Sequence, residues 1–168
     1  MKRIYLITKR KEVPVNTAFD NLIAHFDEHG LSYRVDAEQR LIRTGYQGRV
    51  CSCELIAVAD EGDDFFQVIA FVPVAIPEGC RAAVVETITR ANFGLKIGKF
   101  EFDYDEGRLR FQVCQVLVDG RLDEQMIRHA IACCLSMIDR YVPAVLSVIY
   151  GNEQPQDAVR FAEADVAR

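Results

Sequence analysis

The chain has 168 residues, half of them hydrophobic and 27% charged, with a formal net charge of -5 at pH 7. Such a composition is ordinary for a soluble globular protein and argues against a disordered chain. Because nucleic-acid binding needs a concentrated basic face, the acidic balance also argues against general affinity for nucleic acid.

The length and the charge pattern predict a single domain over residues 1–168. We expect a basic arm over residues 1–15, a core over residues 16–158 and a frayed tail over residues 159–168. The arm gathers five basic side chains against one acidic side chain, and such short runs are usually solvated. Binding of the arm to an anionic partner is the alternative.

No apolar run in the sequence has the length of a secretory signal or of a membrane span. Residues 4–7 form a short apolar run that basic residues follow, and the most apolar segment, residues 141–150, contains Pro143. We therefore expect a cytoplasmic protein without membrane contact. In that compartment the six cysteines are expected to be reduced thiols that pack as small hydrophobic side chains.

Apolar residues at helical spacing predict a first helix, which Asn16 or Thr17 caps and Gly30 ends. Three strand patterns follow, over residues 31–36, 41–46 and 50–60. The third strand places four residues on one face: Cys51, Cys53, Leu55 and Ala57. The acidic cluster at residues 60–64 then predicts a hairpin turn.

The strand predicted over residues 65–76 is apolar on both of its faces. Such a strand lies centrally in a sheet, or has helices on one face and a partner on the other. Pro77 ends it and begins a helix that carries Val84 and Ile88 and ends near Gly94.

An antiparallel hairpin follows this helix directly. Residues 99–105 alternate between apolar and charged side chains, and residues 108–118 return after a turn. Val116 and Val118 fall on the opposite face from the earlier apolar residues of the return strand. We therefore predict a bulge near residues 114–115, with burial of both faces at the far end as the alternative.

The longest helix begins after Asp123 and ends near Gly151, and a wide apolar stripe runs along it. Pro143 is expected to kink this helix rather than end it, because the apolar period continues beyond. Residues 155–168 predict one more short amphipathic helix. The order α-β-β-β(-β)-α-β-β-α predicts an α+β fold, an antiparallel sheet of about five strands with helices on one face.

Two groups of residues are candidates for metal or thiol chemistry. Cys51 and Cys53 point the same way on a strand, and His129 and Cys133 are four residues apart on the long helix. Together they would complete a tetrahedral zinc site if the helix packs over the strand. The spacing of two thiols by one residue is not the usual zinc-knuckle spacing, however, and both cysteines continue an apolar face. Buried core thiols are therefore the favoured interpretation.

His25 and His29 form the second candidate, four residues apart on the first helix. No third ligand joins them at a fixed spacing, and Phe26 marks the buried side of the helix. We therefore expect both histidines at the surface. Because no catalytic motif is present either, the sequence predicts no catalytic, cofactor-binding or metal site.

Residues 91–103, which join a helix end to the hairpin, resemble the central signature of the YbjN family. Residues 105–111 are similar to the turn and return strand of that family, and the whole resemblance covers residues 16–158. It implies a fold like that of the type III secretion chaperones. It also implies a non-enzymatic, often dimeric protein that handles other proteins through an exposed sheet or helix face, in a family described as bacterial sensory-transduction regulators.

We therefore expect a protein-binding module, chaperone-like or regulatory in bacterial signalling, with a protein or peptide partner. A homodimer would pair two sheets or two copies of the helix that carries Val84 and Ile88. Two alternatives remain open. The first is a small thiol- or zinc-dependent enzyme that uses Cys51, Cys53, His129 and Cys133. The second is a binder of nucleic acid or of anionic surfaces that acts through the basic arm.

Overall fold

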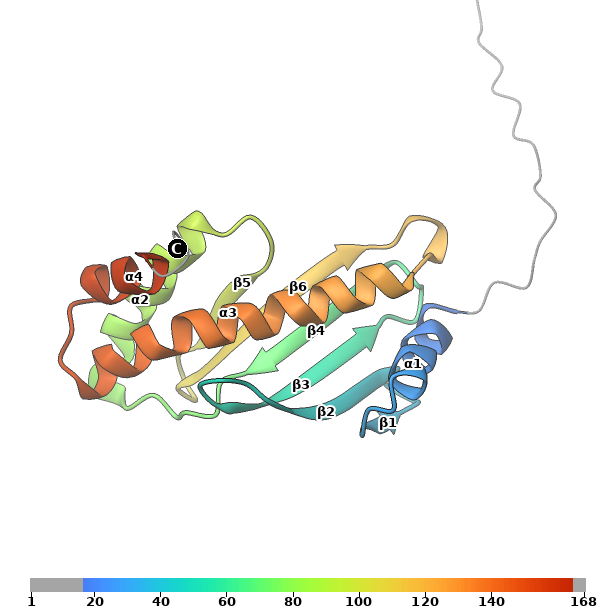
Figure 1. The fold of residues 1–168 in the computed structure, drawn as a ribbon, viewed down its shortest axis with the longest axis horizontal. Helices are drawn as coiled ribbons and strands as arrows, with labels where there is room; N and C mark the ends of the chain where they lie inside the picture. The colour runs from blue at the N-terminus through green and yellow to red at the C-terminus, as the bar shows by residue number, and fades with distance from the viewer. Residues whose placement is uncertain (1–16, 165–168) are drawn as a thin grey trace, which may run out of the picture.

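The structure is a computed structural model that describes residues 17–164. Within this range one antiparallel sheet of six strands has the order β1-β2-β3-β4-β6-β5, and the long helix lies across one of its faces (Figure 1). The strands are β1 (Arg34–Asp36), β2 (Leu41–Gln47), β3 (Ser52–Ala59), β4 (Phe65–Phe71), β5 (Lys99–Asp103) and β6 (Arg108–Val116). The helices are α1 (Ala18–Glu28), α2 (Arg81–Gly94), α3 (Glu124–Tyr150) and α4 (Pro155–Ala164), with short 3-10 turns η1 (Glu78–Cys80) and η2 (Val118–Gly120). The predicted α+β class is confirmed, with six strands in place of about five.

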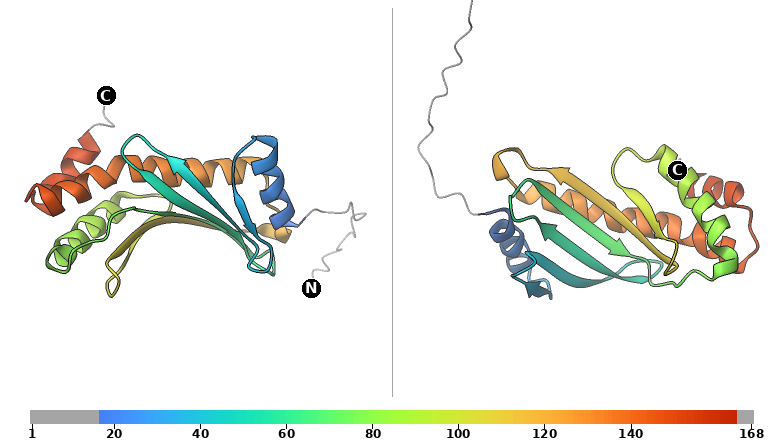
Figure 2. Two further views of the ribbon diagram at one scale, coloured as in Figure 1. Left: turned by 90° about the horizontal axis from the view of Figure 1, so that it is seen from below. Right: turned by 180° about the vertical axis from the view of Figure 1, so that it is seen from behind.

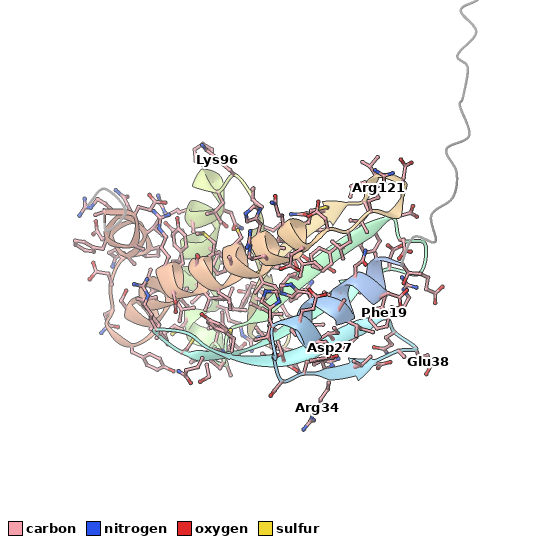
Figure 3. The ribbon with its side chains drawn as sticks, turned by 45° about the vertical axis from the view of Figure 1, so that its right-hand side comes forward. Phe19, Asp27, Arg34, Glu38, Lys96 and Arg121 are labelled. Carbon is pink, nitrogen blue, oxygen red and sulfur yellow. The ribbon has the colours of Figure 1, made fainter. Side chains whose placement is uncertain are left out.

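The first helix, α1, begins and ends as its sequence predicts. The N–H of Asp20 donates to the Thr17 hydroxyl (3.2 Å), and the N–H of Thr17 donates to the Asp20 carboxylate (3.0 Å). Gly30 follows the last turn with a φ of +61°, a conformation that favours glycine. Figure 3 labels Phe19 and Asp27 on α1, which lies beside the first turns of α3.

The long helix α3 supplies much of the apolar cover of the sheet. The Asp123 carboxylate caps it by accepting a hydrogen bond from the N–H of Met126 (2.8 Å), and the helix continues through Pro143 to Tyr150. Contrary to the prediction that no segment has the length of a membrane span, α3 is long and apolar enough for one. The buried core helix of a globular protein meets the same criterion, and 39% of the most apolar window of α3 is buried. The residues that α3 contributes to the core are Ile127, Ala130, Cys134, Ile138, Tyr141, Val142 and Val145.

The two faces of the sheet differ. On the face toward α3, Leu55, Phe66 and Phe111 are buried in the main core. The opposite, open face carries a smaller apolar cluster: Leu41, Ile56, Val58, Ile69 and Phe71. In the left view of Figure 2 the sheet arches toward α3 and its ends curve away from the helix, so that the open face is concave. The two-sided apolar character predicted for the strand that begins at Phe65 is thus confirmed.

Two details of the predicted strands are wrong. β4 ends earlier than predicted, at Phe71, because Pro73 has no N–H to donate to a neighbouring strand. The pairing of β4 with β6 runs without a bulge from Phe65 opposite Val116 to Phe71 opposite Arg110. Since β6 keeps its two-residue period, Val116 lies on the open face, where 79% of its surface is exposed rather than buried.

A short junction connects α2 to β5. The side-chain amide of Asn92 donates to the carbonyl of Phe100 (2.9 Å), and its oxygen accepts from the N–H of Phe100 (2.7 Å). Gly98 adopts a φ of +72°, and a Cβ at this position would lie 2.6 Å from the ring of Phe111. The junction therefore requires both the amide and the glycine.

Helix α2 packs its apolar side into the core of its own chain. Val84 is fully buried and Ile88 is 6% exposed. Two copies of this helix could therefore not pair through Val84 and Ile88, which their own chain covers, and the homodimer stays a prediction.

The short helix predicted within residues 155–168 is present as α4. It continues to Ala164, and both Ala158 and Val159 are buried, so a helix includes residues 159–164 of the predicted tail. The basic arm predicted over residues 1–15 lies outside the described residues.

Candidate functional site

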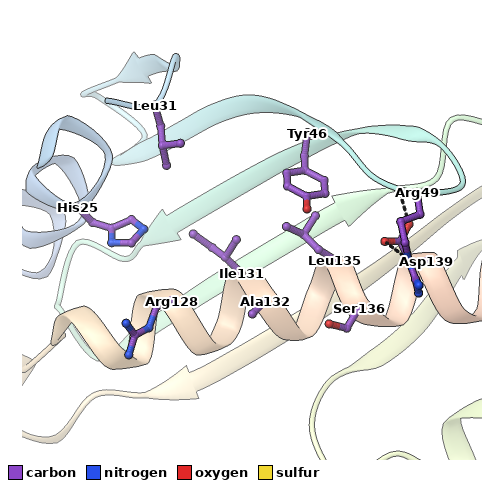
Figure 4. Close-up of a pocket in the computed structure, with 10 residues that line it drawn as sticks. All are labelled: His25, Leu31, Tyr46, Arg49, Arg128, Ile131, Ala132, Leu135, Ser136 and Asp139. Atoms are coloured by element: carbon purple, nitrogen blue, oxygen red, sulfur yellow. Dashed lines mark hydrogen bonds and ion pairs between the residues drawn. The ribbon is translucent and has the colours of Figure 1, made fainter. Parts of the chain in front are cut away.

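A groove runs between α3 and the hairpin of β2 and β3 (Figure 4). Its volume is about 480 Å³. Ile131, Ala132 and Leu135 line it from α3, and Leu31 and Tyr46 line it from the opposite side. The middle of the groove is therefore apolar.

The tip of the hairpin binds α3 at Asp139, a residue that also lines this groove. The Asp139 carboxylate accepts hydrogen bonds from the backbone N–H groups of Arg49 (2.9 Å) and Val50 (3.3 Å). A Cβ at Gly48 would lie 2.7 Å from Oδ1 of Asp139, so the close approach depends on the glycine. The Arg49 guanidinium lies 3.6 Å from Asp139, but it is 86% exposed and adds little stability. The backbone hydrogen bonds anchor the hairpin.

A second groove, of about 720 Å³, continues along α3 and has α4 as its other wall. It shares Arg49, Ser136 and Asp139 with the first groove. From Arg128 to Ser147 the two grooves together follow α3 for about 28 Å, at about 1.5 Å per residue. That length suits about eight residues of extended peptide or about five turns of helix. We call the two grooves together the α3 groove.

The side of α3 that faces the α3 groove has few charges. Ala132, Ser136 and Pro143 are exposed on it. Arg140 is directed toward α4, where its Nε donates to the carbonyl of Ala162 (3.1 Å). Because the solvated face of a helix normally carries charged side chains, this small and apolar surface is suited to contact with another apolar surface.

The open face of the sheet carries a polar ladder beside its apolar cluster. Glu101 accepts hydrogen bonds from Nε of Arg110 (2.8 Å) and from the amide of Gln112 (2.6 Å). Gln112 accepts in turn from Gln67, and Lys99 lies 3.0 Å from Glu101. Burial alone raises the pKa of Glu101, but the hydrogen bonds and charges of Lys99 and Arg110 outweigh burial and lower the pKa below its ordinary value. These polar groups satisfy one another.

The four residues considered as a zinc site do not converge within the described part of the chain. Cys51 and Cys53 lie where the hairpin meets Asp139, and His129 is exposed near the start of α3. Ten helical residues separate His129 from Asp139, a distance of about 15 Å along the axis. Cys133 lies one turn beyond His129, where its thiol faces the carbonyl of Ile97 at 3.9 Å. A shared tetrahedral site is therefore not formed.

The buried thiols are also poor nucleophiles. Burial raises the pKa of Cys53 to about 11, and the nearby charges of Cys51 and Asp139 add to the effect. Burial likewise raises the pKa of Cys134 to about 12, with Cys133 contributing. At neutral pH these thiols are protonated, whereas the thiolate is the reactive form.

The histidine pair differs from its prediction. His25 is only 6% exposed, and its Nδ1 lies 2.7 Å from Oε2 of Glu124. The expectation that both histidines lie at the surface is therefore wrong for His25, whereas His29 is 47% exposed. Glu124 begins α3, and only the packing of α1 beside α3 brings it to the histidines. No spacing rule within α1 reveals a residue that is 99 positions away.

The comparisons with known proteins are consistent with a family assignment. Residues 18–147 match the YbjN family, which is described as "Putative bacterial sensory transduction regulator". The chain belongs to the YbjN family. The resemblance carried by residues 91–103 is thereby confirmed, and the α4 wall of the α3 groove lies outside the matched residues. No curated protein matches this YbjN protein.

Among solved structures, this YbjN protein is similar to a chain of the "Structure of the HopA1-SchA Chaperone-Effector Complex". The TM-score is 0.45 and the sequence identity is 12%, over 70% of this chain and 87% of that chain.

The residues of the signature that the sequence analysis identified in this YbjN protein do not line the α3 groove. Residues 91–103 form the junction between α2 and β5, whereas the groove is lined mainly from α3, α4 and the β2–β3 hairpin. The sequence analysis did not identify the groove. One signal was available: between residues 130 and 149 the only charged residues are Asp139 and Arg140.

Proposed function

We propose that this chain is a non-enzymatic protein-binding module with a regulatory role, and that it binds a protein or peptide segment in the α3 groove. The observation behind this proposal is the side of α3 that has few charges. There Ala132, Ser136 and Pro143 form an uncharged floor of the groove that is open to solvent. The family description supports regulation rather than metabolism. A cytoplasmic location is part of the proposal.

The chemistry of the available side chains supports binding rather than catalysis. The thiols of Cys53 and Cys134 are protonated at neutral pH because burial raises their pKa values. In the groove itself, the Asp139 carboxylate is already bound to two backbone N–H groups of the hairpin. The α3 groove therefore offers contact area and few reactive groups.

The charges at the ends of the first groove indicate the kind of segment that fits. Arg49 and Arg128 are exposed at opposite ends, and Arg128 forms no ion pair within residues 17–164. A partner segment that is mainly apolar and is acidic where it passes Arg49 or Arg128 would complement both the lining and the guanidinium groups. About eight extended residues would fill the length of the groove.

Selection of peptides from a random displayed library on the full chain tests the proposal. We expect enriched peptides that are apolar with at least one acidic residue. Ser136→Arg, which places a long charged side chain on the groove floor, should lower their affinity by about 10-fold or more. Val116→Arg, which places the same side chain at an exposed position on the open sheet face, is the matched control and should change affinity less than about 2-fold. Peptides that bind wild type and Ser136→Arg equally would contradict the proposal.

A homodimer is the second part of the proposal, and light scattering after size-exclusion chromatography measures it. Two copies would pair through the open sheet face or through the α3 groove, because the face of α2 with Val84 and Ile88 is buried. A dimer that Ser136→Arg dissociates would make a second copy the occupant of the groove. A monomer at all concentrations would contradict the dimer.

A further inference from the structure

Two imidazoles and one carboxylate meet where the last turn of α1 lies beside the first turn of α3. His25 and His29 are separated by one helical turn, and their ring centroids are 4.6 Å apart. Nδ1 of His25 lies 2.7 Å from Oε2 of Glu124, and Nε2 of His29 lies 3.6 Å from Oε1 of Glu124. One donor atom from each of the three residues lies within 4.8 Å of the other two.

The hydrogen bond of His29 fixes which of its nitrogens can bind a metal ion. Nδ1 of His29 lies 2.8 Å from the backbone carbonyl of His25, and because a carbonyl only accepts, Nδ1 carries the proton. In the neutral ring Nε2 then carries no proton. Its lone pair faces Oε1 of Glu124 at 3.6 Å, a distance too long for a hydrogen bond. A cation between these two acceptors would satisfy both. Metal-binding histidines typically donate their other N–H to a carbonyl in this way.

We propose that His25, His29 and Glu124 bind a divalent first-row transition metal, with Zn²⁺ as the best match. Two histidines and one glutamate form a known three-ligand set for zinc. At metal–ligand distances of about 2.0–2.2 Å, tetrahedral ligands lie roughly 3.2–3.6 Å from one another, so movements of about 1 Å convert this geometry into a site. His29 and Glu124 are 47% and 44% exposed, which gives the ion a path and leaves the fourth position open to solvent.

A metal ion bound at this site would hold α1 against α3. The described contacts there include one other long-range side-chain hydrogen bond, from the amide of Asn21 to the carbonyl of Leu122 (3.0 Å). A metal held by both helices binds the folded state alone, so it should raise the melting temperature as metal is added. The end of the first groove that contains His25 would be stiffened as well.

Titration of the chelator-treated full chain with Co²⁺, followed in the visible spectrum, tests the proposal. We expect one equivalent to bind and to give a spectrum of nitrogen and oxygen ligands, and Zn²⁺ to displace it. His29→Ala should weaken binding by at least about 10–100-fold, the loss that even an indirect ligand contact causes. His29 is half exposed, so its replacement leaves the fold intact.

His129→Ala is the matched control, because His129 is the third histidine of the chain and is exposed on α3. It should bind Co²⁺ as wild type does. Equal affinity in wild type and His29→Ala, a thiolate charge-transfer band from cysteine ligation, or no binding at millimolar metal would each overturn the proposal. Glu124→Gln should also lose metal binding, because it removes the negative charge of the carboxylate. The variant keeps the shape of the side chain.

Discussion

Two regions of the chain differ in how strictly they restrict their residues. One is the junction that connects α2 to β5, and the other is the α3 groove. In the junction, Asn92 pairs with both backbone groups of Phe100, and Gly98 adopts a positive φ against the ring of Phe111. Almost no other residues meet these requirements. In the groove, Ser136 and its neighbours only need to be small and uncharged, which several residue types satisfy.

This difference explains why the family is recognisable and its partners are not. The residues that form the signature are fixed by contacts within the chain, so they identify the fold. The residues that line the groove are constrained by the partner that binds there, and contacts within a single chain do not identify that partner. Substitutions in the two regions should therefore affect stability and binding in opposite proportions.

The largest effect on stability is expected at Gly98. Gly98→Ala should lower the free energy of unfolding by roughly 2–4 kcal/mol, because alanine is strained at positive φ and its Cβ would meet the Phe111 ring. Urea denaturation measures the loss. Gly94→Ala is the matched control, since a Cβ there meets only Glu163 at 3.6 Å, and it should be nearly neutral. Equal losses for the two alanines would show that the junction has no special requirement.

A smaller loss is expected at Asn92. Asn92→Ala removes two partly buried hydrogen bonds and should lower the free energy of unfolding by about 2 kcal/mol. Hydrogen exchange locates the effect, because the amide of Phe100 loses its acceptor and should exchange faster while the amides of β3 keep their protection. If Phe100 exchanges at an unchanged rate, the bridge does not contribute to the junction.

The sequence predicted the parts of the fold that local patterns determine. Thr17 and Gly30 bound α1 as their chemistry indicates, and the alternation of the hairpin strands placed Phe100 and Phe111 in the core. The predicted bulge was wrong because an exposed Val116 cannot be told from a buried one by its position in a pattern.

The candidate sites were less predictable, since they depend on residues far apart in the chain. Glu124 reaches His25 across 99 positions, and Asp139 reaches Arg49 across 90. Such pairs follow from the packing angle between elements, which periodicity does not encode. The zinc site considered for Cys51 and His129 is not formed for the same reason. The strand that follows Cys51 does lie near α3, but at a different position along the helix axis from His129.

The polar ladder on the open face should have an intermediate effect. Glu101→Gln should lower the free energy of unfolding by about 1 kcal/mol at neutral pH, since it removes the charge that Lys99 and Arg110 pair with. The pKa of Glu101 is lowered in the folded state, so its stabilising contribution is present above its ordinary value of 4.5 and is lost as the pH falls through the folded value. Denaturation at pH 7 and below pH 4 should therefore show a difference from wild type that shrinks with acid. A constant difference would mean that the charge of Glu101 has no part in it.

The smallest effect on stability is expected in the α3 groove. Ser136→Arg changes an exposed side chain on a well-formed helix and should alter the free energy of unfolding by less than about 0.5 kcal/mol, although it should reduce peptide binding. Urea denaturation and peptide titration on the same sample separate the two effects. A variant that loses binding because it is partly unfolded would show both losses together, as Gly98→Ala should. A loss of peptide binding without a loss of folding stability would place the partner on α3. The residues on the floor of the groove would then contribute to contacts with the partner and not to the stability of the isolated chain.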